Sequence, residues 1–214
     1  MKTTLNESTK NVLAVGPHPD DIEVGCFGTL LRHKKAGDNI TVLITTKGGY
    51  SNRSWDLITS EYHCSEKILG IKYEVLDNPI AHYNFNMITV SQIDEVINKY
   101  NIDTIYCNWY GDAHQDHKAS FNNVLAASRK SSVKNLFCYE LGMYNARTQL
   151  VFKPQFFVDI SEFMDLKTKA VTCYQSYFTT DRFIVAMEGL AKQRGFSSGV
   201  KYAESFEVIF NTWR

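Results

Sequence analysis

Short apolar runs alternate with longer segments of helical periodicity along the first two thirds of the chain. The runs are rich in β-branched residues, as buried strands are, whereas the segments between them repeat apolar residues every three or four positions, as amphipathic helices do. The pattern predicts strands at 11–16, 40–46, 72–76, 104–109 and 135–139, and helices at 22–36, 56–69, 90–100 and from 117 to about 129. Such a series predicts parallel strands joined by helical crossovers.

The regular alternation weakens in the last third of the chain. There we expect a strand at 156–160, a helix capped by Ser161, a helix that starts at Asp181 and a closing strand at 203–210. Right-handed crossovers favour an α/β fold with a Rossmann-like, mostly parallel sheet and helices on both faces. No repeat, low-complexity tract or linker interrupts the chain, so residues 1–214 are predicted to form a single domain whose C-terminal third completes the active-site pocket.

Composition and charge narrow the class of protein. The hydrophobic share of 44% is ordinary for a soluble globular protein, and no apolar run approaches the roughly 18 residues of a membrane span. Lys plus Arg and Asp plus Glu both total 23, which indicates neither nucleic acid nor an anionic membrane as a partner. Residues 1–10 are polar and lack the apolar core of an export signal. We expect a cytoplasmic protein with a small-molecule partner, compatible with a homo-oligomer.

The cysteines are odd in number and widely spaced, and no two of them form a Cys-x-x-Cys pair. This pattern favours buried apolar residues over disulfides or sulfur ligands. The five are Cys26, Cys64, Cys107, Cys138 and Cys173.

Residues with metal-binding and acid–base chemistry gather where two predicted strands end. His18, Asp20 and Asp21 follow the first strand, and the run His114-Gln115-Asp116-His117 follows the fourth. Open α/β sheets bind ligands at the carboxyl ends of their strands, so the two clusters could meet. His18 and Asp21 lie three apart across a turn and can converge on one cation. Asp20 is then left uncommitted, as a general base requires.

The motifs Pro17-His18-Pro19-Asp20-Asp21-Ile22-Glu23 and His114-Gln115-Asp116-His117 together resemble those of the PIG-L/LmbE-type zinc-dependent N-deacetylases. That family removes acetyl groups from molecules that contain N-acetylglucosamine. Weaker matches extend over most of the chain: Glu61 with Leu69-Gly70, Phe157-Val158-Asp159-Ile160 with Lys167, Lys169 and Ala170, and Arg194-Gly195 with Gly199-Val200-Lys201-Tyr202-Ala203-Glu204.

The resemblance assigns His18, Asp21 and His117 as metal ligands, a set of three that suits a catalytic Zn²⁺ with one open position. In the cell, iron(II) or another divalent metal could occupy the site instead of zinc. Bound zinc activates a water molecule, and Asp20 is the candidate base that accepts its proton. His114 suits the stabilisation of the oxyanion that forms on the attacked carbonyl.

Asp116 has two possible uses. It either orients a neighbouring histidine from outside the ligand set or caps the helix that begins at His117. Glu23 is expected to be structural, accepting backbone amides of the first turn or packing beside the site. The aromatic segment 77–89 either lines the pocket or covers the sheet.

The residues that bind the substrate are less well marked. Many family members carry an arginine three residues before the glutamate that corresponds to Glu61, but this chain has Ile58 there. Arg53 or Arg147 would take its place, unless the substrate lacks the group that the arginine contacts. Tyr202 either reaches the pocket and stabilises the oxyanion or packs at the end of a strand.

The resemblance implies a hydrolase that removes the N-acetyl group from an amino-sugar conjugate of the N-acetylglucosamine type, releasing acetate and a free amine. A deformylase or another amidase would use the same ligands and base. A non-catalytic metal-binding or nucleotide-binding module is disfavoured, because the first turn has no Gly-x-Gly-x-x-Gly and because Asp20 is uncommitted.

Overall fold

A computed structural model describes residues 9–49, 52–129, 132–142 and 148–212, and within them seven strands form one sheet in the order β3-β2-β1-β4-β5-β7-β6. The strands from β3 to β5 pair in parallel, whereas β7 runs antiparallel to both of its neighbours. The predicted α/β fold with a mostly parallel sheet is therefore confirmed. The strands are β1 (Asn11–Gly16), β2 (Asn39–Ile44), β3 (Tyr73–Val75), β4 (Thr104–Asn108), β5 (Asn135–Tyr139), β6 (Phe156–Asp159) and β7 (Ala203–Asn211).

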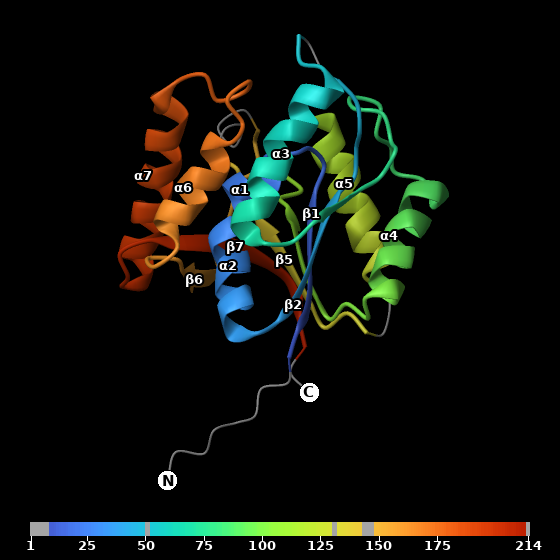
Figure 1. Ribbon diagram of the computed structural model, residues 1–214. Coiled ribbons are helices and arrows are strands. Elements are labelled where there is room, and N and C mark those ends of the chain that lie inside the picture. Colours follow the sequence, from blue (N-terminus) through green and yellow to red (C-terminus); the bar gives the residue numbers. More distant parts are fainter. Residues whose placement is uncertain (1–8, 50–51, 130–131, 143–147, 213–214) are drawn as a thin grey trace.

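Helices cover both faces of this sheet, with α4 and α5 on one face and α1, α2, α3 and α6 on the other (Figure 1). Strand β1 is apolar on both faces, because Val12 and Ala14 pack in one core and Leu13 and Val15 in the other. No helix in the described part of the chain is long and apolar enough to cross a membrane. The helices are α1 (Asp21–Gly25), α2 (Phe27–Ala36), α3 (Trp55–Leu69), α4 (Met87–Lys99), α5 (Gln115–Ala127), α6 (Met164–Thr172) and α7 (Asp181–Ser198).

The carboxyl ends of β1 and β4 lie side by side at the point where the strand order reverses. Strand β1 is hydrogen-bonded to β2 on one side and to β4 on the other, and Val15 pairs with Cys107. The loop after β1 leads into α1, and the loop after β4 leads into α5. Ligands of open α/β sheets bind at such a switch point, so the fold places both sequence motifs where a site is expected.

The helix predicted over 22–36 is broken at Cys26 into α1 and α2. Cys26 has φ −146° and ψ 16°, outside the helical region, although the apolar periodicity continues across it. The break leaves a carbonyl group at the end of α1 and amide groups at the start of α2 without partners inside a helix.

Residues from the last third of the chain supply those partners. Lys167 Nζ donates to the carbonyl oxygen of Val24 at 2.7 Å. The Glu204 carboxylate accepts from the amides of Gly28 and Thr29 at 2.9 and 2.7 Å. Lys167 and Glu204 also form an ion pair whose side chains are 2% and 3% exposed. The break depends on residues more than a hundred positions away, so local periodicity could not predict it.

Three predicted helix starts are also corrected. Helix α4 begins at Met87 rather than at residue 90, because the Asn86 side chain accepts from the amides of Ile88 and Thr89. Helix α5 begins at Gln115 rather than at residue 117. Ser161 does not cap α6, which starts at Met164; its hydroxyl instead accepts from the amide of Tyr202 at 3.1 Å.

The expectation for the cysteines is wrong for one pair. Cys64 on α3 and Cys173 at the C-terminal end of α6 form a disulfide, with their Cα atoms 5.8 Å apart. Helices α3 and α6 pack together. The disulfide joins two residues that are 109 positions apart in the sequence. The other three, Cys26, Cys107 and Cys138, are buried free thiols, as predicted.

Candidate metal and catalytic site

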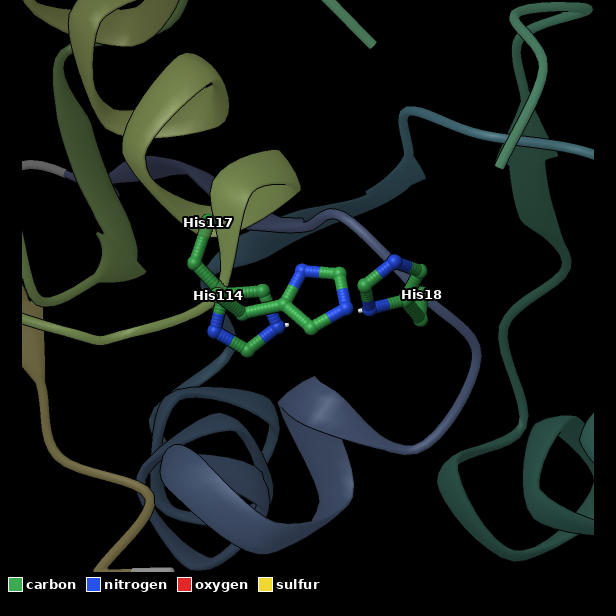
Figure 2. A group of neighbouring side chains, drawn as sticks. All are labelled: His18, His114 and His117. Carbon is green, nitrogen blue, oxygen red and sulfur yellow. Dashed lines mark hydrogen bonds between the residues drawn. The ribbon is translucent and has the colours of Figure 1, made fainter. Parts of the chain in front are cut away.

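The two motifs meet at the edge of the sheet. His18 comes from the loop after β1, and His114 and His117 come from the start of α5. Figure 2 shows the three rings gathered together, with ring nitrogens of His18 and His117 facing each other. The ring centroids lie 4.8 to 5.2 Å apart. Residues almost a hundred positions apart thus form one cluster.

Three side chains present donor atoms at the spacing that a tetrahedral metal ion requires. His18 Nδ1 lies 3.3 Å from His117 Nε2. Asp21 Oδ2 lies 3.4 Å from His18 Nδ1, and Asp21 Oδ1 lies 3.4 Å from His117 Nε2. Zinc–ligand bonds of about 2.0–2.1 Å at tetrahedral angles separate neighbouring ligand atoms by about 3.3–3.4 Å. Asp21 meets His18 through Oδ2 and His117 through Oδ1, so these pairwise distances suit Zn²⁺ once one carboxylate oxygen turns toward both histidines.

His114 is the alternative third ligand. The donor atoms of His18, His114 and His117 all lie within 4.8 Å of one another, which allows one ion to be held after small movements. One Asp21 oxygen lies 3.4 Å from His18 Nδ1 and the other lies 3.4 Å from His117 Nε2, both shorter than 4.8 Å. The geometry therefore fits the set with Asp21 better.

Two further carboxylates contact the ring nitrogens of His18 and His117 that do not face the metal position. Asp116 Oδ2 lies 2.9 Å from His18 Nε2 and also accepts from the amide of Ala81 at 2.8 Å. Asp116 is not the cap of α5, because that position belongs to His114, whose Nδ1 accepts from the Asp116 amide. Asp112 was not singled out from the sequence, yet its Oδ2 lies 3.0 Å from His117 Nδ1. The only feature of the sequence that could have indicated Asp112 was its position as an acidic residue two positions before the second motif.

Replacing Asp112 with Asn is expected to weaken metal binding by about 10- to 100-fold. Asp112 lies against His117 Nδ1 and accepts from the His114 amide at 2.8 Å, so it fixes the His117 ring with Nε2 toward the cluster. Metal affinity is measured by competition with a chelator. The exposed Asp56, changed to Asn, is the matched control. Equal affinities in the two variants would contradict this role.

The charges in the cluster stabilise a cation. Burial alone would lower the pKa of His18, but hydrogen bonds to Asp116 and Asp21 and the negative charges of Asp21 and Asp20 raise it to about 10. Burial would raise the pKa of Asp21, yet the positive charges of His117 and His18 lower it. The space between these side chains therefore favours positive charge, carried by a proton or by a metal ion.

Asp20 is buried beside the donors at the N-cap position of α1, but its side chain does not cap the helix. Its backbone is left-handed, with φ 112° and ψ −29°, and within the described residues its side chain makes no capping hydrogen bond. Burial and the negative charge of Asp21 raise the pKa of the Asp20 carboxyl well above its usual value. Such a carboxylate accepts a proton more readily than an exposed one.

His114 faces the same space as a hydrogen-bond donor. Its Nδ1 accepts from the Asp116 amide at 3.2 Å, so the neutral ring carries its proton on Nε2. Burial and the positive charges of His18 and His117 lower the pKa of His114, which favours this neutral form.

A small cavity opens directly onto the cluster. Its volume is about 150 Å³, and Arg53, Ile58, Ile80 and Tyr177 form its wall beyond the histidines and aspartates. Arg53, one of the two arginines considered from the sequence, thus lines the cavity, whereas Tyr177 was not singled out from the sequence. Sites for drug-sized ligands usually measure about 300–1,000 Å³, so this cavity admits one end of a larger molecule.

The other predicted pocket residues have different outcomes. Arg147 lies outside the described residues. Tyr202 is placed elsewhere, because its hydroxyl donates to Glu188 at 2.9 Å and it borders a separate surface hollow; the prediction that it reaches the pocket is wrong. The segment 77–89 serves both expected uses, since Ile80 lines the cavity and Tyr83 is buried.

Glu23 is structural, but its partners are side chains. Its Oε1 accepts from the hydroxyl groups of Ser65 and Tyr73 at 2.6 and 2.8 Å. Burial raises the pKa of this carboxyl. Glu23 therefore joins α1 to α3 and β3 and does not face the cavity described above.

Comparisons with known proteins show which family the chain resembles. The family model for PIG-L, GlcNAc-PI de-N-acetylase, matches residues 13–128. The chain is 30% identical to the uncharacterized deacetylase YaiS of Escherichia coli (strain K12), over 78% of this chain and 91% of that protein. It is 26% identical to the diacetylchitobiose deacetylase of Thermococcus kodakarensis, over 94% of this chain and 83% of that protein. The crystal structure of the conserved protein TT1542 from Thermus thermophilus superposes with a TM-score of 0.83 and 26% identity, covering 96% and 97% of the two chains.

Proposed function

Because the chain belongs to the PIG-L family of deacetylases, we propose that it is a zinc-dependent hydrolase acting on a small amino-sugar conjugate of the N-acetylglucosamine type. It removes the N-acetyl group and releases acetate and a free amine. One observation carries the proposal. Asp20 is buried, its side chain makes no capping hydrogen bond to a described residue, and it lies beside His18, Asp21 and His117, whose ring nitrogens and carboxylate oxygens approach one another to 3.3–3.4 Å.

In this proposal, His18 Nδ1, an oxygen of Asp21 and His117 Nε2 hold the metal, and Asp116 and Asp112 orient the two histidines. The ion, when bound, would polarise the amide carbonyl and activate water. Zinc is proposed because two histidines and a carboxylate with an open fourth position match a catalytic zinc centre. The same donors suit iron(II), so metal analysis of the purified protein decides between the two ions.

The chain's own groups then divide the proton transfers. Asp20 takes the proton of the attacking water. Neutral His114 donates from Nε2 to the carbonyl oxygen as negative charge develops there. The amine leaves with a proton returned from Asp20, so the carboxylate is regenerated.

The cavity determines which part of the substrate is enclosed. At about 150 Å³ it encloses the acetamido end, while the rest of the conjugate extends past Arg53 and Tyr177. Arg53 is close enough for its charge to act on Asp20, and it replaces the arginine that many relatives carry at the position of Ile58. We assign Arg53 to the binding of hydroxyl or anionic groups on the sugar.

The proposal keeps the partner and the compartment expected from the sequence. A single domain over residues 1–214 acts on a small molecule in the cytoplasm, without nucleic acid or membrane. A disulfide such as Cys64–Cys173 is uncommon there, and those that occur usually respond to the redox state. The equal totals of 23 basic and 23 acidic residues support the absence of a polyanionic partner.

The test is a panel of N-acetylglucosamine conjugates incubated with zinc-loaded protein, with new amine and acetate measured together. Matched N-formyl conjugates separate a deacetylase from a deformylase. We expect acetate and amine in equal amounts, and their loss after chelation of the metal. Faster release of formate would favour the deformylase, and hydrolysis of no conjugate would contradict an enzyme of this class.

A further inference from the structure

Three contacts fasten the segment 173–178, which follows α6, to α3 and the residues before it. Cys173 is disulfide-bonded to Cys64. The amide and hydroxyl groups of Ser176 both donate to the Glu61 carboxylate, each at 2.7 Å. Tyr177 lies next along the segment, with its ring centroid 4.8 Å from the Arg53 guanidinium carbon. Residue numbers rise along one stretch and fall along the other, so the two stretches pack side by side in antiparallel directions. We call this row of three contacts the seam.

The seam ends inside the candidate substrate pocket. Arg53 and Tyr177 both line the cavity that contains the donor cluster, whereas Cys64 is exposed on α3. A guanidinium stacked on an aromatic face loses little further freedom when it binds a ligand. The free side chain of an arginine, in contrast, would have to be ordered at the moment of binding.

We propose that Tyr177 is a positioning residue that holds Arg53 in its substrate-binding orientation, and that the Cys64–Cys173 disulfide locks the segment carrying Tyr177. This inference rests on the proposed function for the role of Arg53 in substrate binding. It adds a residue that tunes substrate affinity through Arg53 and a covalent bond that couples the pocket to the thiol redox state.

The redox step is a simple exchange. A dithiol transfers two electrons and two protons to the Cys64–Cys173 bond, which gives two cysteine thiols and the oxidised cyclic disulfide of the reagent. Ser176 then still binds Glu61, but the covalent end of the seam is released. Because a broken cross-link allows more conformations of the segment, Tyr177 spends less time against Arg53.

The experiment follows Arg53 directly by NMR of zinc-loaded, nitrogen-labelled protein. Stacking on Tyr177 shifts the Arg53 Nε–Hε signal upfield, and we expect Tyr177→Ala or reduction with dithiothreitol to remove that shift. Tyr177→Phe keeps an aromatic ring and should retain it. On a hydrolysed conjugate, Tyr177→Ala should raise KM by roughly two- to fivefold with kcat little changed, while Tyr177→Phe restores KM.

Cys64→Ser is the control for the disulfide. In the Arg53 signal and in KM, this variant should resemble the reduced unmodified protein, and adding dithiothreitol to the variant should change neither. An Arg53 signal unaffected by Tyr177→Ala or by reduction would overturn the proposal, as would an equal response of Cys64→Ser to the reductant. The NMR result stands without any substrate, so failure of the proposed function is seen separately, as a conjugate panel that yields no amine.

Discussion

Replacing Asp20 with Asn is expected to lower turnover by about 10²- to 10⁴-fold while bound zinc stays at the level of the unmodified protein. Asn has the shape of Asp and tolerates the left-handed backbone at this position, so the fold and the neighbouring donors persist. The amide cannot accept the proton of the attacking water. Amine release and bound zinc are measured on the same preparation.

Asp21→Asn should behave differently, because it removes a charged donor from the trio and weakens metal retention as well as turnover. His114→Ala should keep its zinc if Asp21 is the third ligand, and lose it if His114 is. An Asp20→Asn protein with full zinc and near-normal turnover would contradict the assigned base. The proton would then pass to another group, for which His114 is best placed.

Replacing Lys167 with Met is expected to lower the free energy of unfolding by about 3–5 kcal/mol. The substitution leaves Glu204 as a buried carboxylate without its cationic partner and frees the carbonyl of Val24 at the end of α1. Equilibrium unfolding in urea measures the change. We expect a lower midpoint with a similar slope, as for a loss of stability without a change in the surface exposed.

Lys35→Met is the matched control for this experiment. Lys35 forms an ion pair with Glu162, but the two side chains are 60% and 62% exposed, and solvent screens such pairs. Its substitution should leave the unfolding midpoint almost unchanged. If the two variants lost equal stability, the buried pair would not have the special role that its burial indicates.

The sequence predicted the parts of the site that depend on strand ends. His18, Asp20 and Asp21 follow β1 directly, and His114 and His117 follow β4, so a parallel sheet brings them together without any knowledge of side-chain packing. The strand pattern also predicted the parallel core, since parallel strands buried on both faces are apolar throughout.

The remainder depends on contacts that no local pattern encodes. Asp112 and Tyr177 belong to irregular segments, so neither periodicity nor spacing placed them beside the donors. The disulfide partner of Cys64 lies across the α3–α6 contact. Some of the residues that weakly match the family stabilise the fold and take no part in the chemistry. Glu61 fastens the segment after α6, and at Gly195 a Cβ atom would lie 2.7 Å from the Lys201 carbonyl oxygen.

The dependence of the α1–α2 break on Lys167 and Glu204 also orders events during synthesis of the chain. The ribosome has made every proposed metal donor once His117 is complete, yet the carboxylate that binds the start of α2 belongs to β7. A nascent chain therefore carries these donors while the junction between α1, which holds Asp21, and α2 still lacks its partners. The metal centre would therefore reach its final form only after β7 has docked, although all of its donors are translated by residue 117.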